Sequence, residues 1–272
     1  MKPRSKITLR CLLLWTMIFG NLFEVTRIYS QSENLRQARR VLRGENVSYM
    51  LTNNACSYLW AESGSRNSTP LQGFNVNATE YLEDYVIEVD GKILQRNQAE
   101  TSIYSDRIVR DYTDINLTEE ASLMDSLPVL MIKLTSTKKV PIAFIPLISD
   151  VNTPRNFTAH WDEDGRLLFV TRGNMMVSNS DLRSKSWTGI FVYPESDYVN
   201  INLGAQRYYV GLTQQGNVLP GKLTSFIDNP VYIFVIVGKD RQEVMDRRKI
   251  TLDQLNLYMR DKTTKIEGVR KT

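Results

Sequence analysis

The sequence has little of the chemistry that enzymes use most often. Its 272 residues include one histidine, His160, and two cysteines, Cys11 and Cys56. No cysteine and no second histidine lies near His160, so the sequence indicates neither a zinc site nor a Ser-His-Asp triad, and a strand-end histidine with a satisfied hydrogen bond is the plainer interpretation. Gly238-Lys239 lacks the preceding glycines of a phosphate-binding loop. We therefore predict no metal ion and no cofactor.

A surplus of charge of one sign is absent from most of the chain. The formal net charge is +4, but residues 1–30 contain five basic residues and one acidic residue, which leaves 29 of each sign in residues 31–272. The folded part has no net attraction for polyanions, so we predict no nucleic-acid partner. With 42% hydrophobic and 24% charged residues, the composition is that of a globular protein.

Residues 1–30 have the features of a signal peptide. A basic start precedes an apolar run from Cys11 to Gly20 that is too short to span a bilayer comfortably. We expect cleavage after Ser30 and no membrane attachment afterwards, with an uncleaved membrane anchor as the alternative. Cys56 is then the one remaining cysteine, so the mature chain has no internal disulfide and its core must come from apolar burial.

Short strand patterns separated by turns predict a β-domain over residues 46–238. In the first, Val47, Tyr49 and Leu51 share one side, Asn53-Asn54 can turn the chain, and a strand from Ser57 to Trp60 pairs back. Further strands are predicted at 84–89, 92–96, 103–112, 116–124, 129–135, 140–148, 156–161, 166–171, 175–177, 187–193, 199–203, 206–212 and 231–237. The strands from 103 to 148 are expected to form a meander. So many strands imply two packed antiparallel sheets.

Helical spacing appears at the two ends of this domain. Leu35, Ala38 and Leu42, with Gly44 as a stop, predict a short helical lead-in within residues 31–45. From residue 239 a second apolar period predicts an amphipathic linker helix, followed by a polar tail at 263–272. Its apolar positions are Met245, Leu252, Leu255 and Met259. The expected fold is mainly β, a two-sheet antiparallel sandwich with a short N-terminal helix and a C-terminal linker helix.

Several short motifs occur in a set order. They are Leu51-Thr52-Asn53, Gln72-Gly73-Phe74, and the stretches 85–91, 104–110, 119–125 and 238–243. In order and spacing they resemble the N-terminal β-supersandwich domain of bacterial amylo-α-1,6-glucosidases, the glycogen-debranching type of six-hairpin glycosidase, over about residues 46–262. The resemblance implies a secreted or periplasmic bacterial protein. In that family the catalytic carboxylates lie in a helical barrel after the β-domain; because this chain ends soon after the linker helix, we expect no catalytic residue in it.

Aromatic side chains and one polar loop are the candidate sugar-binding features. The loop at 61–70 has no apolar period and follows Trp60. The resemblance implies a loop that helps to form a sugar site, although related enzymes carry a Thr-Arg-Arg-Tyr-His-Gly-like run where this chain has residues 66–73. The candidate carbohydrate-binding residues are Trp60, Arg66, Gln72, Trp161 and Asp162.

Each of these features also has a structural interpretation. Aromatic residues of a β-sandwich belong more often to its core than to a binding surface. The acidic run at 162–164 precedes Gly165 and is also turn chemistry between two strands. Glu119 and Glu120 point to opposite faces of a strand, so they do not serve one site together.

Two functional hypotheses follow. The first is an exported, non-catalytic N-terminal domain of a glycoside hydrolase that acts on α-glucans, truncated or split, with a six-hairpin catalytic domain packed on the C-terminal helix. The alternative is a free-standing module that binds carbohydrate or another surface. The helix discriminates between them, because an independent module buries its apolar stripe on its own sandwich whereas a linker leaves part of it exposed. We expect the helix to serve chiefly as a linker, so truncation after Val237 should lower the melting temperature only modestly.

Overall fold

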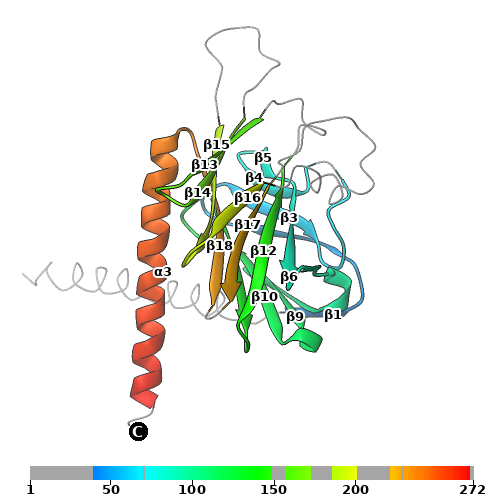
Figure 1. Cartoon of the computed structure of the whole chain (residues 1–272). Coiled ribbons are helices and arrows are strands. Elements are labelled where there is room, and N and C mark those ends of the chain that lie inside the picture. Colours follow the sequence, from blue (N-terminus) through cyan, green and yellow to red (C-terminus); the bar gives the residue numbers. More distant parts are fainter. Residues whose placement is uncertain are drawn as a thin grey trace, which may run out of the picture.

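The computed structural model describes residues 39–69, 71–148, 157–172, 186–200, 221–227 and 230–269, and side chains of the last range up to residue 257. The predicted signal peptide and the predicted strands at 175–177 and 206–212 lie outside these residues. The predicted class is confirmed: the protein is mainly β, with antiparallel sheets in two layers and a C-terminal helix (Figure 1). Within the described ranges, no helix is long and apolar enough to cross a membrane.

The first layer is a nine-stranded sheet. In spatial order its strands are β1 (Arg39–Arg43), β8 (Glu100–Tyr104), β9 (Arg107–Tyr112), β10 (Leu117–Leu123), β11 (Val129–Ser136), β18 (Val231–Gly238), β15 (Ser186–Tyr193), β14 (Leu167–Arg172) and β13 (Phe157–Asp162). Central strand β18 is buried along its whole length. Because successive side chains alternate, Ile233 and Val235 face the second layer while Phe234 and Ile236 face the other side.

The second layer consists of two smaller sheets. One has the order β16 (Asp197–Asn200), β17 (Gly221–Ile227), β12 (Val140–Leu147), β6 (Asp84–Val89) and β7 (Lys92–Ile93). The other has β2 (Ser48–Thr52), β3 (Ser57–Glu62), β4 (Gly73–Val76) and β5 (Thr79–Leu82). Leu51, Phe74, Ile87 and Phe144 from these sheets join one apolar cluster with the inner face of the large sheet. This cluster is the main core. Two short 3-10 helices, η1 (Arg96–Gln98) and η2 (Thr113–Ile115), lie between strands.

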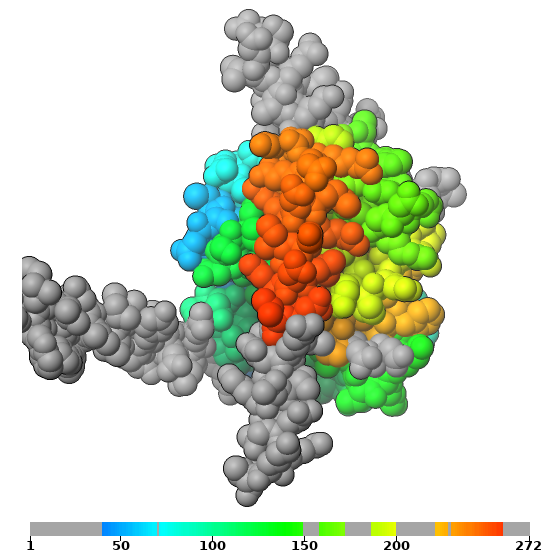
Figure 2. Space-filling model, turned by 90° about the vertical axis from the view of Figure 1, so that its left-hand side faces the viewer, coloured from blue at the N-terminus to red at the C-terminus, as the bar shows by residue number. Residues whose placement is uncertain are grey.

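The C-terminal helix α3 (Arg241–Val269) covers the outer face of the large sheet over β18 and β15 (Figures 1 and 2). Asp240, the residue before the helix, is its N-cap. The Asp240 Oδ1 accepts a 2.8 Å hydrogen bond from the Glu243 backbone N–H. Val244 and Leu255 are buried in a second apolar cluster. The predicted helix is therefore confirmed, but it continues to Val269 through the region expected to be a polar tail.

Three further predictions are wrong. Residues 39–43 of the predicted lead-in helix form β1, because backbone pairing with β8 and burial of Leu42 outweigh the helical spacing. The single strand predicted at 103–112 is the hairpin of β8 and β9. The meander does not continue from β11 to β12, because β11 pairs with β18 in the first layer and β12 pairs with β6 in the second.

Candidate functional site

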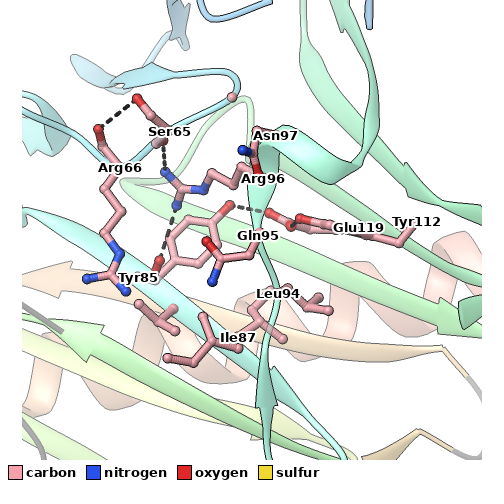
Figure 3. Close-up of a pocket in the computed structure, with 13 residues that line it drawn as sticks. Ser65, Arg66, Tyr85, Ile87, Leu94, Gln95, Arg96, Asn97, Tyr112 and Glu119 are labelled. Carbon is pink, nitrogen blue, oxygen red and sulfur yellow. Dashed lines mark hydrogen bonds between the residues drawn. The ribbon is translucent and has the colours of Figure 1, made fainter. Parts of the chain in front are cut away.

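A polar cavity of about 210 Å³ opens beside β6 (Figure 3). One wall comes from the loop after β3, the other from the segment that connects β7 to η1, and buried side chains of β9 and β10 close the base. The polar residues that line it are Ser65, Arg66, Tyr85, Gln95, Arg96, Asn97, Tyr112 and Glu119. The loop predicted at 61–70 therefore does border a hollow, with its first two residues, Ala61 and Glu62, still within β3.

Arg96 joins the two walls. Its Nη2 lies 2.5 Å from Asp84 Oδ1 and its Nη1 donates to the Ser65 carbonyl oxygen at 3.0 Å. Its guanidinium also lies 4.8 Å from the centre of the Tyr85 ring. Burial, the largest single cause, lowers the pKa of Arg96, but the charge and hydrogen bond of Asp84 together with Tyr85 raise it by more, so the pKa lies above its ordinary value. The cation is permanent and fixes the loop to the sheet.

The base of the cavity is a buried ion pair. Arg110 Nη1 donates to Glu119 Oε1 at 2.7 Å, and the side chains are 1% and 2% exposed. Tyr85 donates to the same oxygen at 2.6 Å, and Tyr112 donates to Oε2 at 3.2 Å. Arg110 Nε donates to the Ser63 carbonyl at 3.1 Å. This pair therefore holds the start of the loop from below.

The tyrosines of this network are permanent donors. Burial, with Glu119 as the next cause, raises the pKa of Tyr85 and that of Tyr112. Burial lowers the pKa of Arg110, and Glu119 together with the tyrosines raises it by more, so the net shift is upward. Neither hydroxyl ionises near neutral pH, and the arrangement of charges at the base stays constant.

Gln72 shapes the loop from inside. The side chain is 2% exposed, and its Oε1 accepts hydrogen bonds from the backbone N–H groups of Ser68 and Thr69 at 2.8 and 3.0 Å. Its Nε2 donates to Glu62 Oε1 at 2.6 Å. The amide is thus engaged within the protein, and Gln72 is better described as a residue that positions the loop than as one that contacts a ligand.

The other predicted site residues lie in three places. Arg66 lines the cavity, and in Figure 3 it flanks Tyr85 opposite Gln95. Trp60 is half-buried on β3 and donates from Nε1 to Ser48 Oγ at 2.9 Å, an oxygen that Gln72 Nε2 also approaches at 3.3 Å. The structure thus brings Trp60 and Gln72 together beneath the loop.

Trp161 and Asp162 belong to β13, at the far edge of the large sheet. The Trp161 ring stacks on Tyr198 at 5.7 Å and packs against the main core. Asp162 Oδ2 accepts a 2.8 Å bond from Arg241 at the start of α3. These two residues hold elements together and are not part of the cavity.

Sequence reasoning missed Arg96 and Arg110. Arg96 was assigned to a strand, and its partner Asp84 lies 12 positions earlier, beyond any local period. Arg110 did leave a signal, because it lies between Ile108 and Tyr112 on the inward-facing side of β9. A charge at such a position requires an opposite charge nearby, and Glu119 is its cross-strand partner in β10.

The carboxylates around the cavity are engaged within the protein. Both carboxylates near the cavity, Asp84 and Glu119, accept bonds from several donors. Side chains that can meet a ligand at the opening are Arg66, Gln95 and Asn97. Across the part of the chain that the structure describes, no group of three or more His, Cys, Asp or Glu side chains is arranged to hold a metal ion.

No protein-family model matches the chain, and no curated protein matches it either. Among solved structures it is similar to the crystal structure of a bacterial glucoamylase complexed with acarbose, with 11% sequence identity and a TM-score of 0.43. The alignment covers 79% of this chain and 38% of that one. The chain therefore spans well under half the length of that protein.

Proposed function

We propose that this chain is an exported, non-catalytic β-supersandwich domain of the six-hairpin glycosidase type that binds neutral carbohydrate at the cavity beside Arg66. The order of the sequence motifs supports the family, and the observed two-layer β architecture agrees with what that resemblance implies. The predicted signal peptide supports a secreted or periplasmic location. α-Glucans are the first carbohydrates to test.

The observation that carries the proposal is the engagement of the carboxylates. Glycoside hydrolysis needs one carboxyl group that gives a proton and a second that attacks or activates water. Here Glu119 accepts from Tyr85, Tyr112 and Arg110, and Asp84 is paired with Arg96. These groups build the walls of a binding site, and amide and guanidinium groups at its opening are suited to sugar hydroxyls.

A second candidate is the N-terminal part of a split enzyme, with a six-hairpin catalytic domain packed on α3. It is favoured by two exposed apolar side chains of the helix, Ile250 and Leu257, which are 44% and 60% exposed. Burial of Val244 and Leu255 on the protein's own sheet instead favours the independent module. The helix therefore supports a self-contained domain more strongly than a linker to a catalytic domain.

Affinity electrophoresis in gels that contain glycogen tests the proposal. We expect the full chain to be retarded, and retardation to decrease in Arg66→Ala and in Asn97→Ala, because both side chains line the cavity. Arg43→Ala is the matched control, because Arg43 lies on β1 and its side chain is 81% exposed. The absence of retardation in the unmodified chain would refute carbohydrate binding of this kind. Release of glucose from glycogen by the purified chain would refute the non-catalytic assignment.

A further inference from the structure

A larger hollow of about 800 Å³ lies over β16, β17, β12 and β6, strands that run side by side in Figure 1. Ile87, Phe144 and Leu223 of these strands point into the main core. Their neighbours in sequence therefore point outward, to the face of the five-stranded sheet that is turned away from the core. Among those outward neighbours are Glu88, Ala143 and Thr224, all of which border the hollow.

A row of side chains crosses this face. Asp197 is paired in register with Thr224, Thr224 with Ala143, and Ala143 with Glu88. Neighbouring strands lie about 4.8 Å apart. Because Thr224 and Ala143 are small, they leave open space above the sheet between the carboxylates of Asp197 and Glu88. Each carboxylate forms an ion pair. Arg166 lies 2.6 Å from Asp197, and Lys222 lies 2.7 Å from Glu88.

The charges around the hollow balance. The acidic lining residues are Glu88, Glu195 and Asp197, and the basic ones are Lys139, Arg166 and Lys222. The lining as a whole therefore has no electrostatic preference for a polyanion or a polycation. Ion pairs held at fixed positions still present both donors and acceptors to the hydroxyl groups of a neutral ligand.

An aromatic ring and a buried hydroxyl complete the lining. Phe226 is 58% exposed, an unusual position for a phenyl ring, and it lies in register with Pro141. Lys139 Nζ is 5.8 Å from the centre of the Phe226 ring. Ser196 is 3% exposed, and its Oγ has no hydrogen-bond partner among the described residues. A buried hydroxyl in this state calls for a ligand or a water.

We propose that this hollow is a second binding site, for a neutral oligosaccharide, separate from the cavity beside Arg66. The ligand class rests on the proposed function; the site rests on the lining. The apolar face of a sugar ring packs on Phe226 and Pro141, its hydroxyls meet the two ion pairs, and one hydroxyl satisfies Ser196. The volume falls within the roughly 300–1,000 Å³ typical of ligand sites.

The test is a titration of the full chain with maltoheptaose, in which binding is measured by calorimetry and by saturation-transfer NMR. We expect two sites. Phe226→Ala weakens one of them about tenfold, since the ring face supplies much of its apolar contact. Ser196→Ala weakens the same site and, because it removes an unpaired group, does not reduce the melting temperature. Val41→Ala is the control, since Val41 is 39% exposed on β1 of another sheet.

The outcomes separate this inference from the proposed function. If Arg66→Ala abolishes binding while Phe226→Ala and Ser196→Ala leave it unchanged, the second site is refuted and the proposed function stands. If Phe226→Ala and Ser196→Ala abolish binding while Arg66→Ala leaves it unchanged, the hollow is the binding site and the proposed site beside Arg66 is refuted. If a polyanionic oligogalacturonate binds as tightly as maltoheptaose, and Phe226→Ala weakens that binding, the assignment of a neutral ligand is refuted. Absence of binding to maltoheptaose in every form overturns both proposals.

Discussion

Both faces of the nine-stranded sheet bury side chains, but by different chemistry. Toward the second layer the interior contains the Arg110–Glu119 pair, with tyrosine hydroxyls bonded to it. Toward α3 the interior is apolar and rich in aromatic rings, among them Phe169, Phe191 and Phe234. The side toward the second layer thus adds directional bonds to an apolar core, whereas the side toward α3 depends on apolar area and fit alone.

This difference relates to what each side positions. A buried charge needs a partner at a defined place, so the ion pair ties β9, β10 and the loop after β3 to one arrangement. That arrangement is the base of the cavity. Apolar contacts beneath α3 lack such directional demands, so that side contributes stability without setting the geometry of the site.

Deletion of residues 239–272 is the most severe way to break the comparison. Loss of Val244 and Leu255 alone removes about 3–6 kcal/mol of burial energy, because each buried side chain contributes roughly 1.5–3 kcal/mol. Against a typical net stability of about 5–15 kcal/mol, and with the aromatic face newly exposed, we expect no cooperative unfolding transition. Circular dichroism during heating is the measurement.

A chain that ends at Leu257 is the control for that deletion, because it keeps both buried side chains. It should unfold cooperatively, close to the full chain. If the longer deletion also unfolds cooperatively within a few degrees, the linker expectation from the sequence is right and the helix is not part of this domain's core.

Glu119→Gln tests the polar side of the sheet. The change keeps the shape of the side chain but leaves Arg110, which is 1% exposed, without a counter-charge. Removal of one partner of a buried pair costs about 3–5 kcal/mol, which denaturant unfolding should detect. Glu120→Gln is the matched control: it lies on the opposite face of β10 and should change stability by less than about 0.5 kcal/mol. Similar losses in both variants would contradict the assigned role of the pair.

Much of the fold was predictable from local patterns. Alternation identified β2, and the strands predicted at 84–89 and 231–237 correspond to β6 and β18. Strands β4 and β5 were missed, because each has four residues and all of β4 is buried, so no alternation is visible. Strand β17 was also missed, because the inward-facing Ser225 interrupts the alternation of apolar side chains.

The candidate site was predictable only in outline. The polar loop was found from its composition, and Arg66 does line the cavity. The Arg96–Asp84 and Arg110–Ser63 contacts join segments that no local period connects, and the latter two residues are 47 positions apart. Val244, which is fully buried in α3, was missed because its neighbour Met245 fits the heptad-like spacing better.

Gly189→Ala sharpens the comparison on the apolar side. A Cβ at Gly189 would lie 2.4 Å from Val244 Cγ1, so the helix must shift away from β15. Overpacking of this kind costs about 1–3 kcal/mol in the free energy of unfolding. In the double variant with Val244→Ala the contact is relieved, and the combined loss should be smaller than the sum of the single losses. Simple additivity in urea unfolding would show that α3 does not pack as described.

The smallest effect is expected at the ion pair between Asp162 and Arg241, at the exposed edge of the interface between α3 and the sheet. A hydrogen bond from Arg241, opposed by burial, lowers the pKa of Asp162. A carboxyl with a lowered folded-state pKa contributes stability above its unfolded pKa of about 3.9 and loses that contribution as the pH falls through the folded value. Because Arg241 is 57% exposed, the contribution is under about 1 kcal/mol. Asp162→Asn should therefore lower stability slightly at pH 7 and leave it unchanged at pH 2. Glu163→Gln, an exposed neighbour in the following turn, is the control. An equal loss from Asp162→Asn at both pH values, in urea titrations, would show that Asp162 acts through packing and not through its charge.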